Sequence, residues 1–569
     1  MKTEITVTVK PENEKNIGLI KKLLMNELQK KPEAAEAAAS GVDVEFVFVK
    51  KSIDARHGQV KLHLRYAAYI GEKAPQADTA LPVWKKADGK KSVIIVGSGP
   101  AGLFAALKLL EYGIKPVIIE RGNETAQRRK DIALISTQGV VNGESNYCFG
   151  EGGAGTFSDG KLYTRSNKRG DIGGILRIFH AFGADEKILT DAHPHIGTDR
   201  LPKIINAMRN RIIELGGEVR FGCRCTDFLI KDGMVQGVRV ESLGGPSRAS
   251  GTPDGSGTPD GSGTPGGSGT TEIYADAVIL ATGHSAQDIY MQLAKVAPQS
   301  LEAKTFAVGV RVEHPRTVID EIQYHGKAGS LEQAGLGAAE YRVTTQVDGR
   351  GVYSFCMCPG GFVVPSASGP EEIVVNGMSA AARNSKWSNA AIVVETRPED
   401  IPQSFVEQAR ELGCTALAGL LFRTDLEHKA WEQSKGQAAP AQLVTDFLGN
   451  RATVQEAFPP TSYTPGIISS NLNEWMPSFI TERLAQGLRQ INQSMKGFIH
   501  PAALMIAPET RTSTPVRILR NKETMECTGL PGLYPAGEGS GYAGGIVSSA
   551  MDGENVAMAI VSSFYPRNQ

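Results

Sequence analysis

One glycine-rich segment constrains the fold more than any other part of the sequence. Val93-Ile94-Ile95-Val96 is an apolar run, as a strand buried on both faces requires. It continues directly into Gly97-Ser98-Gly99-Pro100-Ala101-Gly102, and apolar residues at helical spacing follow as far as Gly113. A second apolar run, 116–119, ends on Glu120. Strand, glycine-rich turn, helix, strand and acid in this order predict a Rossmann-type dinucleotide-binding unit.

Each part of this segment has a physical task. Gly97 permits a tight turn, Gly99 lets backbone amides approach a pyrophosphate, and Gly102 lets the helix lie close to the strand. The helix N-terminus offers unpaired N–H groups and the positive end of its dipole to phosphates. Glu120 stands at the end of the second predicted strand, where its carboxylate can accept the hydroxyls of an adenosine ribose.

Two later segments favour FAD over NAD as the bound dinucleotide. Residues 277–280 predict an apolar strand that ends in Ala281-Thr282-Gly283, and residues 529–536 predict a strand that ends in Gly537-Glu538. An apolar helix starts near Gly544. Its N-terminus can stabilise negative charge on a reduced flavin, while Glu538 can bind the ribityl or pyrophosphate part. Because the chain has one glycine fingerprint and FAD is expected to occupy it, we expect any reaction with NAD(P)H to be inefficient or to use an atypical site.

Other segments carry a resemblance to a known family, and they are 51–56, 150–162, 194–199, 355–361 and 508–517. Through them the chain resembles the two-domain flavoproteins of the fumarate-reductase and succinate-dehydrogenase type. It is more closely similar to bacterial FAD-utilizing (NAD(FAD)-utilizing) dehydrogenases of unestablished substrate. The resemblance implies that 152–158 wraps the flavin and pyrophosphate. It also implies that the reactive flavin edge lies where a substrate domain meets the FAD domain.

These arguments predict a set of residues that contact FAD. They are Gly97, Ser98, Gly99, Pro100, Ala101, Gly102, Glu120, Arg121, Gly152, Gly153, Ala154, Gly155, Thr156, Ser158, Ala281, Thr282, Gly283, Gly537, Glu538, Gly544, Gly545 and Ile546.

Three residues are the predicted catalytic groups: Lys161, His284 and Arg511. Lys161 can neutralise a phosphate or face the active cavity. Arg511 can bind a carboxylate, deliver a proton or form a structural salt bridge. Further polar candidates for the same region are Arg311, Cys356, Cys358, Arg383 and His500.

Cys356 and Cys358 lie on a predicted strand, 353–358, that enters a turn at Pro359. Residues i and i+2 of a strand face the same side, so both sulfurs can face one cavity. Their Cα atoms would be about 7 Å apart in a regular strand, at the limit for a disulfide, and closing the bridge needs a bulge or a strained turn. The sequence therefore favours packing or cavity lining over redox activity and metal binding, and predicts that the protein takes up two electrons.

The pattern along the chain predicts an α/β protein with several domains. Residues 1–88 show the order β-α-β-β of a small ferredoxin-like αβ domain, with a linker near its end. Residues 91–305 predict the first part of a Rossmann-type FAD-binding domain, 306–500 an inserted α+β substrate domain, and 501–569 the rest of the FAD-binding domain. A low-complexity repeat at 244–269 predicts a flexible loop at the tip of a hairpin.

Composition excludes several classes of function. Lysine plus arginine equals aspartate plus glutamate at 61 each, which gives no support to a nucleic-acid partner. No apolar run approaches the length of a membrane span, and seven cysteines do not form a disulfide framework, so we expect a cytoplasmic protein. His193 and His195 have no third ligand at a recognisable spacing, and we expect no metal.

The predicted function is that of an FAD-dependent oxidoreductase that passes a hydride between a small-molecule substrate and noncovalently bound FAD. Two alternatives are a flavin-dependent tRNA-modifying protein and a non-catalytic FAD-bound scaffold or redox sensor. The neutral net charge counts against the first of these.

Overall fold

The computed structural model describes residues 1–32, 42–55, 60–74, 80–164, 170–243, 269–326 and 336–566. Its centre is a five-stranded parallel sheet in the order β22-β10-β4-β5-β6. The strands are β4 (Ser92–Val96), β5 (Lys115–Ile119), β6 (Glu218–Arg220), β10 (Ala277–Leu280) and β22 (Leu533–Pro535). β22 comes from the C-terminal part of the chain and lies in the same sheet as β4, the strand before the glycine fingerprint. This agrees with the predicted α/β fold, in which the C-terminal part returns to the FAD-binding domain.

Both faces of this sheet are buried, which explains its uninterrupted apolar strands. On one face, Val93 and Ile95 pack against α3 (Pro100–Glu111) and α15 (Ile546–Phe564). On the other face, Ile94 and Val96 share a core with a second, antiparallel sheet. That sheet has the order β7-β8-β9, with β7 (Cys223–Lys231), β8 (Met234–Ser242) and β9 (Thr270–Tyr274).

The predicted repeat loop, 244–269, lies outside the described residues except for Gly269, but the strands on either side of it are described. β8 and β9 pair as far as Glu241 and Thr270, and the Ser242 N–H donates to the Gly269 carbonyl over 3.1 Å. Shortening 251–268 to a few glycines and serines is therefore expected to leave flavin content and melting temperature nearly unchanged. Loop length changes stability by only about 0.6 kcal/mol per doubling. Flavin absorbance and thermal melting check this, and loss of flavin would show that the segment contributes to the site.

A seven-stranded sheet forms the centre of the substrate domain, in the order β13-β14-β17-β12-β20-β18-β19. Its strands are β12 (Phe306–Pro315), β13 (Thr344–Val347), β14 (Arg350–Cys358), β17 (Trp387–Thr396), β18 (Ala439–Leu443), β19 (Ile467–Ser469) and β20 (Leu504–Glu509). Because β20 pairs with β12 and β18, the chain leaves this sheet only after Glu509, and not at the predicted boundary of 500. An apolar strand alone does not reveal which of two sheets it joins.

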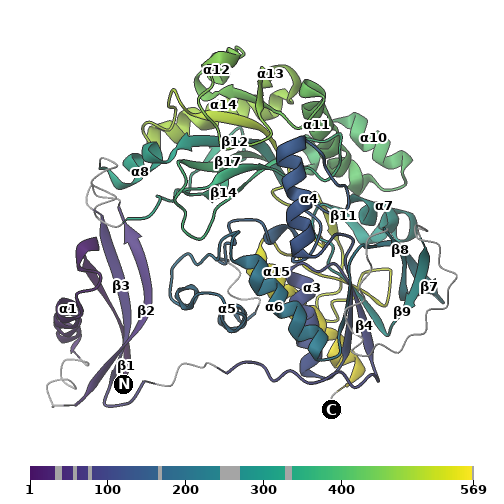
Figure 1. Cartoon of the computed structure of the whole chain (residues 1–569), viewed down its shortest axis with the longest axis horizontal. Helices are drawn as coiled ribbons and strands as arrows, with labels where there is room; N and C mark the ends of the chain where they lie inside the picture. The colour runs from purple at the N-terminus through teal and green to yellow at the C-terminus, as the bar shows by residue number, and fades with distance from the viewer. Residues whose placement is uncertain are drawn as a thin grey trace.

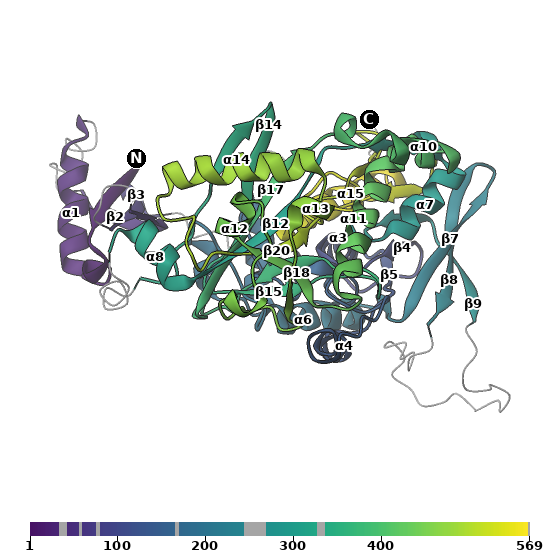
Figure 2. The ribbon, with the colours of Figure 1, turned by 90° about the horizontal axis from the view of Figure 1, so that it is seen from above.

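Helices pack on one face of the five-stranded sheet and gather on one side of the seven-stranded sheet (Figures 1 and 2). The helices near the substrate-domain sheet are α8 (Arg316–Tyr324), α10 (Gln403–Glu411), α11 (Ala418–Ser434), α12 (Val444–Leu448), α13 (Leu472–Trp475) and α14 (Ser478–Ser494). The remaining helices of the FAD-binding part are α4 (Thr125–Gln138), α5 (Ile172–Ala181), α6 (Leu201–Glu214) and α7 (Gln287–Val296). Two short sheets pair β11 (Leu301–Ala303) with β21 (Val516–Ile518) and β15 (Phe362–Pro365) with β16 (Val375–Met378).

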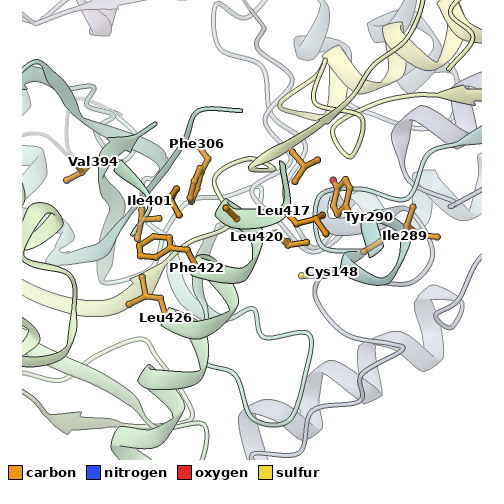
Figure 3. Close-up of a cluster of buried hydrophobic side chains, with 14 of the residues drawn as sticks. Cys148, Ile289, Tyr290, Phe306, Val394, Ile401, Leu417, Leu420, Phe422 and Leu426 are labelled. Carbon is orange, nitrogen blue, oxygen red and sulfur yellow. The ribbon is translucent and has the colours of Figure 1, made fainter. Parts of the chain in front are cut away.

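One continuous apolar cluster joins the two large parts of the molecule. It includes Tyr290 on α7 of the FAD-binding part, and Phe306, Leu420 and Phe422 of the substrate domain (Figure 3). The FAD-binding and substrate-domain sheets therefore share packed side chains, which fixes the walls of any cavity between them.

The N-terminal unit lies at one end of the molecule, opposite β7-β8-β9 (Figures 1 and 2). It consists of β1 (Lys2–Val9), α1 (Ile17–Gln29), β2 (Val44–Asp54) and β3 (Lys61–Ile70), in the sheet order β1-β3-β2. β3 lies antiparallel between the other two strands, which is the split β-α-β arrangement of ferredoxin-like folds. Among the described helices of the whole chain, none has the length and apolar character that a membrane crossing requires.

Candidate functional site

A single cavity brings together most of the predicted FAD-contacting residues. Those that line it are Gly97, Gly99, Pro100, Ala101, Glu120, Arg121, Gly153, Ala154, Gly155, Ser158, Ala281, Thr282, Gly283, Gly537, Glu538, Gly544, Gly545 and Ile546. The predicted catalytic residues Lys161, His284 and Arg511 line the same cavity. Ser98, Gly102, Gly152 and Thr156 do not line it but support its wall through hydrogen bonds or close packing.

The glycines of the fingerprint stand where side chains do not fit. A Cβ on Gly97, whose φ is +108°, would lie 2.3 Å from the Ala281 carbonyl oxygen. A Cβ on Gly102 would lie 2.1 Å from the Gly97 carbonyl oxygen. α3 begins at Pro100 directly after this turn and directs its N-terminus at the cavity. The unpaired N–H groups and the dipole of a helix start suit a pyrophosphate there.

The carboxylate of Glu120 is the centre of a hydrogen-bond hub. One oxygen accepts from the Ser98 N–H (3.0 Å) and hydroxyl (2.8 Å), and the other accepts from the N–H groups of Gly122 (2.9 Å) and Gly150 (3.0 Å). Glu120 thus ties the fingerprint turn, the end of β5 and the following loop together. The predicted contact between Glu120 and the ribose remains a prediction. A ribose hydroxyl that donates to Glu120 would add to the four hydrogen bonds that this carboxylate already accepts.

The loop that precedes 153–158 is organised by Arg128 of α4, which the sequence analysis did not single out. The guanidinium is fully buried and donates to the carbonyl oxygens of five residues at 2.7–3.1 Å. They are Asn146, Tyr147, Gly150, Glu151 and Gly153. Burial lowers the pKa of Arg128 to about 10, which still leaves it charged at neutral pH. Five carbonyls bound on one side of the loop fix its path along the cavity.

Glu538 is a carboxylate of the cavity wall whose oxygens are available to a ligand. Among the described residues its side chain has no hydrogen-bond partner, and the nearby cation is Lys304. Burial raises the pKa of Glu538 to about 7. The adjacent α15 starts after Gly545, and no atom lies within 4 Å of a Cβ placed on Gly544. A carboxylate without a protein partner beside an open helix start fits the ribityl hydroxyls and flavin edge of FAD.

Binding of FAD is expected to tighten as pH rises from about 6 to 8. The Glu538 carboxyl is mainly protonated below pH 7, and only its ionised form is a strong acceptor for ribityl hydroxyls. Linkage then raises FAD affinity by up to about tenfold per pH unit below the pKa. Fluorescence titration of the apoprotein measures this, and Glu538→Gln should give a flat profile. A flat wild-type profile would contradict the assignment.

The apoprotein itself should lose stability as pH rises from about 5 to 7, because the Glu538 carboxyl loses its proton at a lower pH in the unfolded chain than in the folded one.

Arg511 lines the cavity, but its guanidinium is fully engaged by the protein. Nε and Nη2 donate to Glu427 at 3.0 and 2.6 Å, Nη2 also to Glu372 at 2.8 Å, and Nη1 to Ser368 at 2.7 Å and the Cys148 sulfur at 3.5 Å. Of the alternatives left open for Arg511, this geometry favours the structural salt bridge. All of its donors have protein acceptors, so a substrate carboxylate would have to displace one.

His284 is held neutral beside this cluster. Its Nε2 lies 3.0 Å from the Arg511 carbonyl oxygen, which can only accept, so Nε2 carries the proton and Nδ1 is an acceptor. Burial, with Arg423 and Arg511 nearby, lowers the pKa of His284 to about 3. An imidazole of this pKa cannot act as a cationic acid at neutral pH, but it can accept a hydrogen bond from a ligand.

Of the three predicted catalytic residues, Lys161 is the one whose side chain retains a hydrogen-bond donor for a ligand. Its ammonium donates to the Met357 carbonyl and pairs with Asp159 at 3.1 Å, and the side chain is 36% exposed. Burial opposes its charge, but Cys358 and Asp159 beside the ammonium raise the pKa of Lys161 overall. An ammonium with three N–H groups and two protein partners retains one donor for an oxygen of a ligand.

The other polar candidates mainly stabilise the substrate domain. Arg311 is fully buried and binds Glu509 through two hydrogen bonds of 2.9 and 3.0 Å. Arg383 binds Asp159 and thereby supports the partner of Lys161. His500 does not line the cavity and accepts a hydrogen bond from the N–H two residues further on.

Cys356 and Cys358 both line the cavity, yet the strand that carries them is irregular. Phe355 pairs with Ala391 and Cys358 with Asn389, so three steps along β14 match two along β17. This is a β-bulge, and Cys356 has a φ of +41°, which is unusual for a residue with a side chain. A second Cys-x-Cys pair that the sequence analysis missed, Cys223 and Cys225, lines the cavity as well.

Two protein families match parts of the chain. The family described as "FAD binding domain" matches residues 90–139, and the family described as "FAD-dependent protein, C-terminal domain-like" matches residues 305–512. An uncharacterized protein of Clostridium beijerinckii is 38% identical over 478 residues, which cover 84% of this chain and 81% of the relative.

Solved structures show more distant similarity. A single-residue variant of the E. coli quinol fumarate reductase subunit FrdA is 12% identical with a TM-score of 0.33, covering 84% of this chain and 71% of that chain. CtdE in complex with FAD is 11% identical with a TM-score of 0.31, covering 84% of this chain and 86% of that chain. The identity to the clostridial protein shows that the chain belongs to the same family as that protein, and the two family matches show that this is a family of FAD-dependent proteins with FAD as the cofactor.

Proposed function

We propose that this protein transfers a hydride between a small-molecule substrate and noncovalently bound FAD. One observation carries the proposal. The cavity that begins at the glycine fingerprint on β4 and α3 continues to Lys161 and to β14 of the substrate domain. A bound dinucleotide and a second small molecule can therefore meet in one cavity, with groups from both domains around them.

The FAD-binding part supplies contacts for each section of the cofactor. The start of α3 would bind the pyrophosphate and Glu120 the adenosine ribose, while 153–158 would lie along the flavin. Glu538 would accept ribityl hydroxyls. The start of α15 at Ile546 would stabilise negative charge on the reduced ring. FAD itself supplies the two-electron chemistry when bound.

The substrate side of the proposal rests on Lys161. Its remaining N–H would bind and orient an electron-rich oxygen of the substrate, such as a carbonyl or carboxylate oxygen. Asp159, itself bound by Arg383, restrains the ammonium. His284 offers an acceptor, while Arg511 keeps the surrounding wall in place through Glu427.

Three measurements test this function. The purified full chain should be yellow and release intact FAD on denaturation, whereas release of FMN, NAD or no nucleotide would contradict the cofactor placement. Anaerobic screening of metabolites should then find one that bleaches the flavin, with NADH and NADPH reacting only slowly.

Lys161→Met should raise the KM for that metabolite while flavin content stays unchanged. If no metabolite class bleaches or reoxidises the flavin, the hydride-transfer proposal fails.

A further inference from the structure

We propose that Cys356 and Cys358 form a redox-active dithiol that exchanges two electrons with FAD. Both residues line the cavity proposed for the cofactor, so the inference rests on that placement. Both cysteines are free thiols in this structure, and the Cys356 side chain is exposed while Cys358 is buried.

The bulge removes the geometric objection that the sequence raised. In a regular strand the two Cα atoms would lie about 7 Å apart, at the limit for a disulfide. The extra residue between Phe355 and Cys358 breaks this spacing, and Cys356 turns into the left-handed region. The Cys358 sulfur now lies 3.3 Å from the Cys356 carbonyl oxygen, against the backbone of the other cysteine. Bulges and left-handed residues with side chains cost free energy and concentrate at functional sites.

Two cations flank the pair. The Lys161 ammonium donates to the carbonyl of Met357, the residue between the cysteines. Arg311 donates to the Cys356 carbonyl at 3.0 Å and lies 4.0 Å from the Cys358 sulfur. Nearby cations stabilise the thiolate that leaves when a disulfide opens. In this arrangement Arg311 and Lys161 would stabilise that thiolate, in addition to their contacts with the backbone of the cysteine segment.

The reaction balances without any further reactant. When the dithiol is oxidised, two S–H bonds break and one S–S bond forms, and two electrons and two protons pass to FAD to give FADH2. In the opposite direction FADH2 reduces the disulfide. Burial raises the pKa of the Cys358 thiol, so this thiol is neutral at neutral pH, and both cysteines give up their protons when the disulfide forms.

The chain contains a matched control pair. Cys223 and Cys225 have the same spacing and line the same cavity, but the strand is regular between them, with consecutive pairs to Ser242, Glu241 and Val240. Neither residue has a positive φ. Their Cα atoms therefore keep the spacing of about 7 Å that disfavours a disulfide.

Anaerobic dithionite titration of the air-oxidised, FAD-loaded full chain tests the proposal. Wild type should take up four electrons per FAD, two for the flavin and two for the disulfide. Cys356→Ser and Cys358→Ser should each lower the uptake to two, while the double variant Cys223→Ser, Cys225→Ser should keep it at four. An uptake of two in wild type would overturn the proposal, as would an uptake of four in Cys358→Ser.

Thiol counting gives a second readout that does not depend on the flavin or on any variant. Alkylation of the air-oxidised wild type after denaturation should modify five of its seven cysteines, with Cys356 and Cys358 protected, and all seven after reduction. Seven modified cysteines before reduction would overturn the disulfide even if the flavin behaves as proposed. Conversely, a protected pair in a protein that releases no FAD would refute the proposed function and leave the disulfide established.

Discussion

Arg128→Met is expected to abolish FAD binding in the purified protein and to lower the free energy of unfolding by roughly 3–5 kcal/mol. The substitution leaves five buried carbonyl oxygens of the loop around Gly150 without their common donor. Each unsatisfied group costs about 1–3 kcal/mol unless the loop rearranges, and rearrangement would remove 153–158 from the cavity wall. Flavin absorbance per chain and urea denaturation measure the two effects.

A matched control for this prediction lies on the same helix. Arg129 is the next residue of α4 and is exposed, so Arg129→Met should keep both flavin content and stability. Arg128→Lys keeps the charge but supplies at most three of the five donors, and it should retain a part of the FAD. Full flavin occupancy in Arg128→Met would show that the loop does not depend on this guanidinium.

Glu120→Ala is expected to weaken FAD binding by about 1–3 kcal/mol through a lost charge-assisted hydrogen bond to the adenosine ribose. The substitution also has a structural effect, because the N–H groups of Ser98, Gly122 and Gly150 lose the carboxylate that accepts their hydrogen bonds. These two effects can be separated, because FMN lacks the adenosine ribose. Titration of the apoprotein with FAD and FMN should show a larger loss for FAD.

Glu124→Ala provides the comparison for this variant. Glu124 lies near Glu120, but its side chain is 54% exposed and pairs with Arg209 on the surface, so FAD affinity should be unchanged. Equal losses of FAD and FMN affinity in Glu120→Ala would assign the carboxylate to the hub alone. Unchanged FAD affinity would place the adenosine elsewhere in the cavity.

The amino-acid sequence determined the central Rossmann unit because its signals are local. Apolar runs such as 93–96 and 277–280 became strands buried on both faces, since no polar residue interrupts them. Gly97 and Gly102 were identified by spacing, and the close backbone contacts at both explain why glycine is required. The split β-α-β order of the N-terminal unit also followed from periodicity, because residues 5–9 and 17–28 show clear strand and helix repeats.

Tertiary structure alone decided how the charged and sulfur-containing groups are used. Arg511 is engaged by Glu427, which lies 84 residues earlier, and no spacing rule connects the two. Arg128 is an ordinary helical residue in the sequence, and only the fold brings the five carbonyls to it. The bulge at Cys356 arises from pairing with the distant strand β17. Local patterns fix backbone conformation within a few residues, whereas the partner of a buried polar group depends on which remote segments the packing brings within hydrogen-bond distance.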